Sequence, residues 1–594
     1  MRSFHVFLAI GLAAMLVVGA IWWLRPLFSD EPATPASETP PALAPTFTPT
    51  ALAAPAPTPA PQPAHTLIQA VHQDADSFNP VLTTNETSLA VIDKLFPRLL
   101  AQDPQTGLAP VSGGGLAVDW RIGEGGQVLT FTLRTDLQWS DGQPVTARDV
   151  QFTYQALVSP AVASPYRTLA AAIAGLSVPR PDTLVVRLQQ PGCPFLQLLR
   201  HPVLPAHAYG DDFSGLRDHP LNQAPTVSAG PFEFVSWTPG QEIVLARRAS
   251  TATPSGAAAV APALQRWIFR VVPDAAERRR LLAAGELDLV RLAPGERQQV
   301  AALPGVVAAT FPENGYTFLA LNLADPADPR PGRDDQDQPV PQPPHPILGD
   351  LRVRQAIAHA IHIQRIDQAI YQGELVPMAS YVLPTVGWAY APGLTPYAYD
   401  PAAAAQLLEE AGWVDRDGDG VREKDGQVLH LTLLTNEDNP RRVQMGEFIQ
   451  ADLAAVGMAV TFQPLPFDRR AQELLGQRFD LALAGWNHVA PDPGLRTFWH
   501  SREDRPGTGY NFTSFHDAGV DTWLDQARLA SECDPEVRAA AYRAVQEEIH
   551  ARLPYVLIGS QTTGWAYSSG WQGVLEPAPW GFVLERRLWQ ETLP

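Results

Sequence analysis

Apolar and polar residues alternate along the chain near residue 130, where Leu129, Phe131 and Leu133 share one face of a predicted strand. A period of two is typical of a strand with one buried side. Thr146 follows, with Asp149 three residues later, which is the spacing of a helix capping box. The pattern therefore predicts a strand, a turn and a capped helix in succession.

Two patterns recur through the rest of the chain: the alternation typical of strands and the 3.6-residue spacing of apolar residues typical of helices. We expect helices at residues 87–100, 274–285, 400–411, 442–456 and 538–552. We expect strands at residues 66–71, 173–178, 183–188, 232–237, 267–272, 315–323, 429–434, 458–463 and 479–485. The strand–helix–strand order over residues 267–290 predicts a parallel crossover connection. The fold class indicated is α/β.

Composition narrows the possible functions. The chain has 594 residues, enough for two or more lobes, and 45% of them are hydrophobic. Its net charge of −19 argues against nucleic acid as a partner, because phosphate binding needs a basic surface. The two cysteines, Cys193 and Cys533, could pair or stay free, and they are too few for a cysteine-based zinc site.

The N-terminal part differs in character from the rest. Residues 6–24 are an apolar run long enough to cross a bilayer. We expect residues 1–27 to be an uncleaved transmembrane signal anchor, with a cleaved signal peptide as the alternative. Residues 28–64 are rich in Pro, Ala and Thr and predict an extended linker.

Residues 139–154 read W-S-D-G-Q-P-V-T-A-R-D-V-Q-F-T-Y. This stretch resembles the signature of extracytoplasmic solute-binding protein family 5, whose members serve peptide- and nickel-type ABC transporters. The sequences G-P-F at residues 230–232 and L-R-V-R-Q-A at residues 351–356 are similar to family motifs and follow in the same order.

The resemblance implies the large periplasmic-binding-protein fold. In this fold two α/β lobes are joined by two crossover segments, an extra subdomain belongs to the first lobe, and the ligand cleft lies between the lobes. The implied division is lobe I with its subdomain at residues 65–320, lobe II at 321–557 and a C-terminal return to lobe I at 558–594.

The resemblance also implies where a solute would bind. The segment that begins at Trp486 is the one most associated with ligand contact. In peptide-binding relatives an Asp three residues after this Trp pairs with the peptide amino group, but this chain has Val489 there. The ligand-binding residues expected are Trp486, Asn487, His488, Asp492, Asn511, Phe78, Asn79, Tyr316 and Trp388.

The acidic loop at residues 415–426, numbered below as positions one to twelve, offers a second kind of site. Carboxylates at its positions one, three and five, with Gly at six, match the front half of a calcium-binding loop, although position twelve is Gly426. The alternative is an acidic turn between a helix and a strand. The ligands of a structural calcium ion would be Asp415, Asp417, Asp419, Val421 and Glu423. No other cofactor is expected.

The function implied is that of a monomeric receptor of an ABC importer, anchored at the cell membrane with its folded part outside the cytoplasm. It would capture a small solute such as a peptide by hinge closure and pass it to permease and ATPase subunits. A membrane-tethered solute sensor is the alternative. We do not expect an enzyme, because the sequence has no G-x-S-x-G, H-E-x-x-H or phosphate-binding glycine loop.

Overall fold

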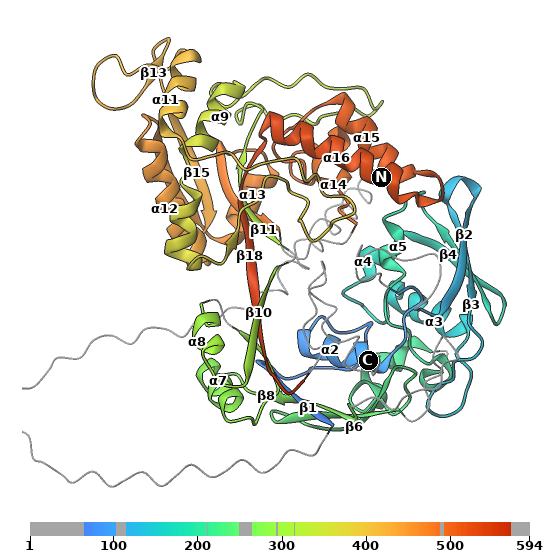
Figure 1. The fold of residues 1–594 in the computed structure, drawn as a ribbon. Helices are drawn as coiled ribbons and strands as arrows, with labels where there is room; N and C mark the ends of the chain where they lie inside the picture. Colours follow the sequence, from blue (N-terminus) through green and yellow to red (C-terminus); the bar gives the residue numbers. More distant parts are fainter. Residues whose placement is uncertain are drawn as a thin grey trace, which may run out of the picture. The chain divides into compact units, whose positions relative to one another are not determined.

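One mixed sheet of twelve strands extends through both lobes of the computed structural model (Figure 1). Its order is β16-β15-β17-β11-β18-β9-β1-β8-β7-β6, and β10 and β12 pair with β18. The strands are β1 (Thr66–Val71), β6 (Phe232–Thr238), β7 (Glu242–Arg247), β8 (Arg266–Val271), β9 (Leu289–Leu292), β10 (Val306–Pro312), β11 (Tyr316–Leu321), β12 (Leu375–Val376), β15 (His430–Asn436), β16 (Ala459–Leu465), β17 (Leu481–Trp486) and β18 (Tyr555–Ser568).

The structure describes residues 65–101, 115–210, 212–248, 264–292, 295–313, 315–486 and 492–571. They belong to a single unit that spans Pro63–Pro594. None of the helices in these ranges is both long and apolar enough to cross a membrane. The predicted anchor and linker lie outside the described residues.

Lobe I is built on β1 and β6–β9 together with a second, four-stranded sheet of order β2-β3-β5-β4. One hydrophobic core, which includes Leu67, Phe131 and Trp267, is shared by both sheets. This second sheet is formed by β2 (Ala117–Gly123), β3 (Val128–Leu133), β4 (Ile173–Arg180) and β5 (Thr183–Leu188). The helices of lobe I are α2 (Glu86–Leu95), α3 (Ala147–Val158), α4 (Arg167–Ala170), α5 (Phe195–Leu198), α6 (Ala206–Tyr209), α7 (Ala275–Ala283) and α8 (Arg297–Ala301).

The predicted start of α3 is confirmed. Thr146 is the N-cap, and its hydroxyl accepts a hydrogen bond from the Arg148 N–H at 3.3 Å. The Asp149 carboxylate accepts one from the Thr146 N–H at 2.8 Å, which completes the capping box. In β3, Leu129, Phe131 and Leu133 are buried as the alternation indicates.

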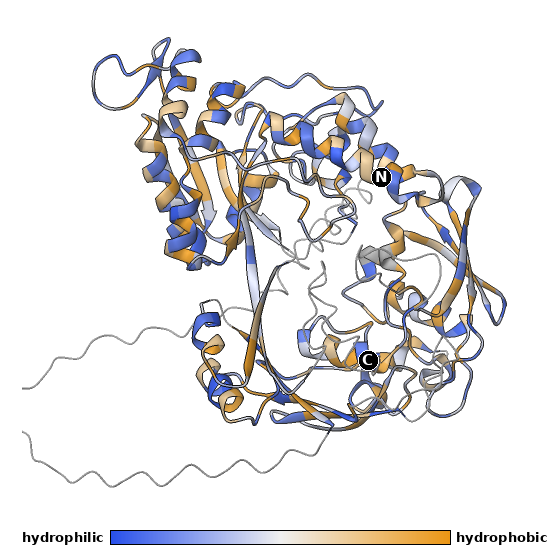
Figure 2. Ribbon diagram, viewed as in Figure 1, coloured by the Kyte–Doolittle hydropathy of each residue, from blue (hydrophilic) through white to orange (hydrophobic). Residues whose placement is uncertain are grey.

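Lobe II contains β11 and β15–β17, and its helices cover the sheet on both sides (Figure 1). Figure 2 shows apolar residues concentrated on the strands and on the helix faces turned toward them. β15 pairs in parallel with both β16 and β17. The α-helices are α9 (Leu351–Ala360), α10 (Ile363–Ile366), α11 (Pro401–Glu410), α12 (Pro440–Ala454), α13 (Phe467–Leu475), α14 (Arg496–Trp499), α15 (Ala518–Leu529) and α16 (Pro535–Arg552).

Two neighbouring segments carry the chain between the lobes. β10 continues into β11, and β18 pairs with both of them in antiparallel fashion. The first part of β18 pairs with β11 in lobe II, and its last residues pair with β9 in lobe I. The segments contact each other where they cross, because the Glu313 N–H donates to the Gln561 carbonyl at 2.7 Å. The crossing strands therefore form the predicted pair of interlobe connections.

The two cysteines form a disulfide between segments that are 340 residues apart in sequence. Cys193 lies in lobe I between β5 and α5, and Cys533 lies in the turn between α15 and α16 of lobe II. Of the two alternatives that the sequence leaves open, the structure shows pairing.

A buried lysine gives the fold a measurable dependence on pH. Lys94 is 1% exposed, and its Nζ lies 4.9 Å from the centre of the Trp267 ring. Burial lowers the pKa of Lys94 from 10.5 to about 8. The unfolded chain therefore binds more protons than the folded protein between these values, so stability rises with pH in this window.

We expect the free energy of unfolding to increase by about 3 kcal/mol between pH 8 and 10.5 through this group. Urea unfolding of the wild type and of Lys94→Met at stepped pH would measure it. The difference in stability between the two proteins should shift in favour of the wild type as the pH rises. A difference that stays constant with pH would show that Lys94 titrates normally.

Candidate functional site

The C-terminal ends of three parallel strands, β15, β16 and β17, lie together at one edge of the lobe II sheet. In open α/β sheets, ligands bind beyond the carboxyl ends of the strands. α12 begins four residues after β15, and α13 begins directly beyond β16. The side chains at this edge are therefore the first candidates for solute contact.

Arg442, in the first turn of α12, lies directly against the end of β17. Its Nη1 donates to the Asn436 side-chain oxygen at 3.0 Å. A Cβ added at Gly485 would overlap its Nη2 and would lie 3.0 Å from the Tyr316 carbonyl oxygen, so the guanidinium fits only because residue 485 is glycine. Burial lowers the pKa of Arg442, while the nearby Asp438 carboxylate raises it.

Arg470, in α13, is the second guanidinium at this edge. It is 7% exposed and lies over the Phe467 ring at 5.4 Å. Among the described residues, neither its Nε nor its Nη1 has a hydrogen-bond partner. Burial and, to a lesser extent, the positive charge of Arg442 lower the pKa of Arg470 to about 10, although Asp438 acts in the opposite direction. A buried cation with unfilled donors favours an anion as its missing partner.

Aromatic side chains line the same edge around Trp486, the last residue of β17. The Trp486 ring centre lies 4.7 Å from that of Phe498 and 5.8 Å from that of Tyr510, and all three rings are half-buried. Tyr316 stands opposite Trp486 in the register of β11 and β17. Together they provide an apolar wall beside the two arginines, which could contact the non-polar part of a solute.

Three other predicted ligand residues of lobe II, Asp492, Asn511 and Trp388, are engaged inside the lobe. Asp492 is 3% exposed and forms an ion pair with Arg538 and accepts a hydrogen bond from the Tyr542 hydroxyl at 3.0 Å. The Asn511 side chain donates to the Phe515 carbonyl at 2.8 Å. Trp388 packs against the Tyr542 ring and the Arg538 guanidinium.

In lobe I, Phe78 is fully buried and packs against Phe234 and Trp237. The Asn79 side chain donates to the Asn222 side-chain oxygen at 2.8 Å. Both residues thus contribute to packing.

Asn487 and His488 lie outside the described residues. Of the nine residues predicted, the structure brings Trp486 and Tyr316 together at the strand ends, while Arg442 and Arg470 were not predicted.

The acidic loop brings three carboxylates together. Ligand oxygens of Asp415, Asp417 and Asp419 lie within 4.8 Å of one another, and all three residues are exposed. Asp415 and Asp419 accept hydrogen bonds from N–H groups of the loop, the latter from Val421 at 2.7 Å. Glu423 instead accepts from the Arg416 N–H at 2.9 Å. Calcium binding at this loop stays a prediction.

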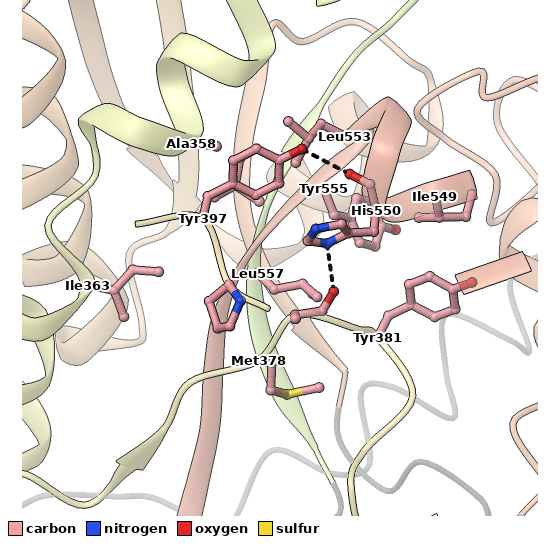
Figure 3. A pocket seen from close by; sticks show the side chains of 13 residues that line it. Ala358, Ile363, Met378, Tyr381, Tyr397, Ile549, His550, Leu553, Tyr555 and Leu557 are labelled. Carbon is pink, nitrogen blue, oxygen red and sulfur yellow. Dashed lines mark hydrogen bonds between the residues drawn. The ribbon is translucent and has the colours of Figure 1, made fainter. Parts of the chain in front are cut away.

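A cavity of about 30 Å³ lies inside lobe II. Figure 3 shows residues that line it, among them Tyr397, His550 and Met378. The Tyr397 hydroxyl donates to the His550 carbonyl at 3.4 Å, and His550 Nδ1 lies 3.0 Å from the Ala379 carbonyl oxygen. Burial lowers the pKa of His550. The cavity has room for about one water molecule, so it is a packing gap and not a solute site.

Comparison with known proteins agrees with this architecture. Protein XP55 of Streptomyces lividans is 28% identical over 522 residues, which cover 86% of each chain. The structure of NikA from Brucella suis in complex with Fe(III)-EDTA matches with a TM-score of 0.67 and 23% identity over 88% of this chain and 99% of that one. The structure of AppA from Bacillus subtilis in complex with a nonapeptide matches with a TM-score of 0.58 and 21% identity over 88% and 97%.

The structural matches, at these identities, show the fold alone, and they confirm the two-lobed α/β class. The sequence profile described as bacterial extracellular solute-binding proteins, family 5 (middle), matches residues 113–505, more than half of the chain. The chain therefore belongs to the bacterial extracellular solute-binding proteins of family 5.

Proposed function

We propose that this protein is an extracytoplasmic receptor that captures a small anionic solute between its lobes and delivers it to the permease of an ABC importer. The observation that carries this proposal is the pair of guanidinium groups at the carboxyl ends of the lobe II strands. Arg470 is buried and has two nitrogens without a partner among the described residues. A carboxylate of the solute would supply the charge and the acceptors that this group lacks.

Capture would proceed by hinge closure. Among the described residues, only two neighbouring strand segments, β10–β11 and β18, carry the backbone between the lobes, which permits rotation about them. A solute favours the closed arrangement only if it binds that arrangement more tightly. In the closed arrangement the solute would contact Arg442, Arg470 and Trp486 on one side and lobe I on the other. These contacts on both sides would make its affinity for the closed arrangement higher than for the open one.

The proposed class of solute agrees with the ligands present in the structures of two similar proteins. AppA is in complex with a nonapeptide and NikA with Fe(III)-EDTA, and both of these ligands carry carboxylate groups. Val489 replaces the Asp that pairs with a peptide amino group in peptide-binding relatives. A carboxylate-bearing solute is therefore proposed in preference to one recognised by its amino group, with peptides retained within that class.

The proposal also includes the oligomeric state, the cellular location and the protein partners of the receptor. We propose a monomer that acts outside the cytoplasm, held at the membrane by residues 1–27 and separated from it by the linker. Permease and ATPase subunits would be its partners. If a bound solute were found but no permease accepted the protein, a tethered sensor would be the better reading.

Native mass spectrometry of the purified protein tests the proposal, together with thermal melting against peptides, metal chelates and sugars. A solute at a hundred times its dissociation constant stabilises the folded state by about 2.7 kcal/mol. We expect a co-purified or added carboxylate-bearing solute to raise the melting temperature. Stabilisation by neutral sugars alone would contradict the anionic assignment, and no response to any solute would contradict the receptor.

Replacing Trp486 tests the role of the apolar wall that Trp486 forms with Phe498, Tyr510 and Tyr316. We expect Trp486→Ala to weaken the affinity for the stabilising solute at least tenfold, since a buried aromatic contact of this size contributes about 1.5–3 kcal/mol. Titration calorimetry would measure the change, and circular dichroism would show that the fold is kept. Trp523, a half-buried residue of α15 in the same lobe, provides the matched control. Equal losses in Trp486→Ala and Trp523→Ala would remove the wall from the site.

A further inference from the structure

The disulfide between Cys193 and Cys533 connects the two lobes away from the crossing strands. Cys193 belongs to the segment after β5 in lobe I, and Cys533 to the turn between α15 and α16 in lobe II. In Figure 1 the turn side of α15 and α16 lies near α5 and β4, well apart from the place where β10 and β18 run together. The chain thus has a third covalent link between lobes that are otherwise joined by two adjacent strand segments.

Hydrogen bonds accompany the disulfide. The Cys193 N–H donates to the Arg528 carbonyl at 3.0 Å, and Arg528 Nη1 donates to the Pro191 carbonyl at 2.9 Å. Cys193 is 4% exposed, and Cys533 packs against the lobe I core. The sulfur atoms are therefore part of an ordered contact between the lobes.

The disulfide and the two crossing strand segments join the lobes at places that are well apart, and this limits how the lobes can move. Two adjacent strands define an axis about which the lobes can rotate, and such hinge motion separates the parts farthest from the axis. A covalent bond between those parts removes most of that rotation. We propose that the Cys193–Cys533 disulfide is a redox-operated restraint that holds the lobes together when oxidised and lets them open when reduced.

The chemistry of release is a thiol–disulfide exchange. A dithiol reductant attacks one sulfur, the Cys193–Cys533 bond breaks, and the reductant leaves as a cyclic disulfide after its second thiol has reacted. The protein gains two electrons and two protons and ends with two thiols. Disulfides persist in oxidising compartments, so outside the cytoplasm the lobes stay restrained until such a reductant has acted, and the hinge closure proposed above requires that reduction first.

This inference rests on the hinge closure of the proposed function, and its test needs no solute. Fluorescence donor and acceptor are attached to unnatural amino acids at Val118 in lobe I and Val537 in lobe II, which are 44% and 37% exposed. Energy transfer in single molecules of the full chain is compared before and after treatment with dithiothreitol. We expect one high-transfer population in the oxidised protein and a major low-transfer population after reduction.

The double variant Cys193→Ser/Cys533→Ser is the matched control. It should show the low-transfer population in both buffers and should not respond to dithiothreitol. A low-transfer population of equal size in oxidised and reduced wild type would overturn the restraint and leave the hinge intact. High transfer in every sample would overturn the restraint and also show that the lobes stay closed without solute, which bears against the proposed function. Two titratable thiols in the native oxidised protein would overturn the proposal directly.

Discussion

Arg470→Met is expected to make the protein more stable and a poorer receptor. The guanidinium is buried, and its Nε and Nη1 have no hydrogen-bond partner among the described residues. An unsatisfied buried polar group costs about 1–3 kcal/mol, and methionine fills a similar volume without that cost. The free energy of unfolding without solute should rise by about that amount.

The affinity for a carboxylate-bearing solute should fall by about 10- to 100-fold in the same variant, since a hydrogen bond to a charged group contributes about 1.5–3 kcal/mol. Urea unfolding and calorimetry measure the two effects separately. Arg469→Met is the matched control, because Arg469 is exposed and paired with Glu473 at 2.7 Å. A variant that loses stability and keeps its affinity would show that Arg470 is a structural residue only.

Asp492→Ala is expected to destabilise lobe II by about 3–5 kcal/mol, because it leaves the buried Arg538 without its charge partner. The side chains of Asp492 and Arg538 are each 2% exposed. The Tyr542 hydroxyl would lose an acceptor at the same time. Chemical unfolding of the variant and the wild type would give the difference.

The double variant Asp492→Leu/Arg538→Met separates this explanation from a role in binding. It removes both charges and should recover most of the stability lost in Asp492→Ala. Its affinity for the solute should equal that of the wild type. If the double variant folds but binds poorly, Asp492 contacts the solute after all, as the family resemblance implies.

The sequence predicted well those elements that are determined by local pattern. The alternation around Phe131 and the capping box at Thr146 correspond to β3 and α3. The predicted helix at residues 87–100 ends earlier, at Leu95, because Phe96, the residue before Pro97, adopts an extended conformation. The apolar pattern alone does not show this end, but Pro97 does, because proline disfavours helical conformation in the residue before it.

The candidate site was predicted only in part. Trp486 and Tyr316 were expected, and the register of β11 and β17 places them opposite each other. Arg470 directly follows Arg469 in α13, and nothing in its sequence context separates it from this exposed neighbour. The pairing of Cys193 with Cys533 depends on the contact between lobes, which no local pattern encodes.

The shared strand β18 also fixes when the protein can finish folding. β18 comes from residues 555–568, almost at the end of the chain, yet it pairs with β9 in one lobe and β11 in the other. Until the ribosome has released these residues, the two halves of the twelve-stranded sheet each keep an open edge to which another chain could add. Neither lobe can therefore complete its part of the sheet until residues 555–568 have been made, and a chain that ends before Tyr555 should aggregate.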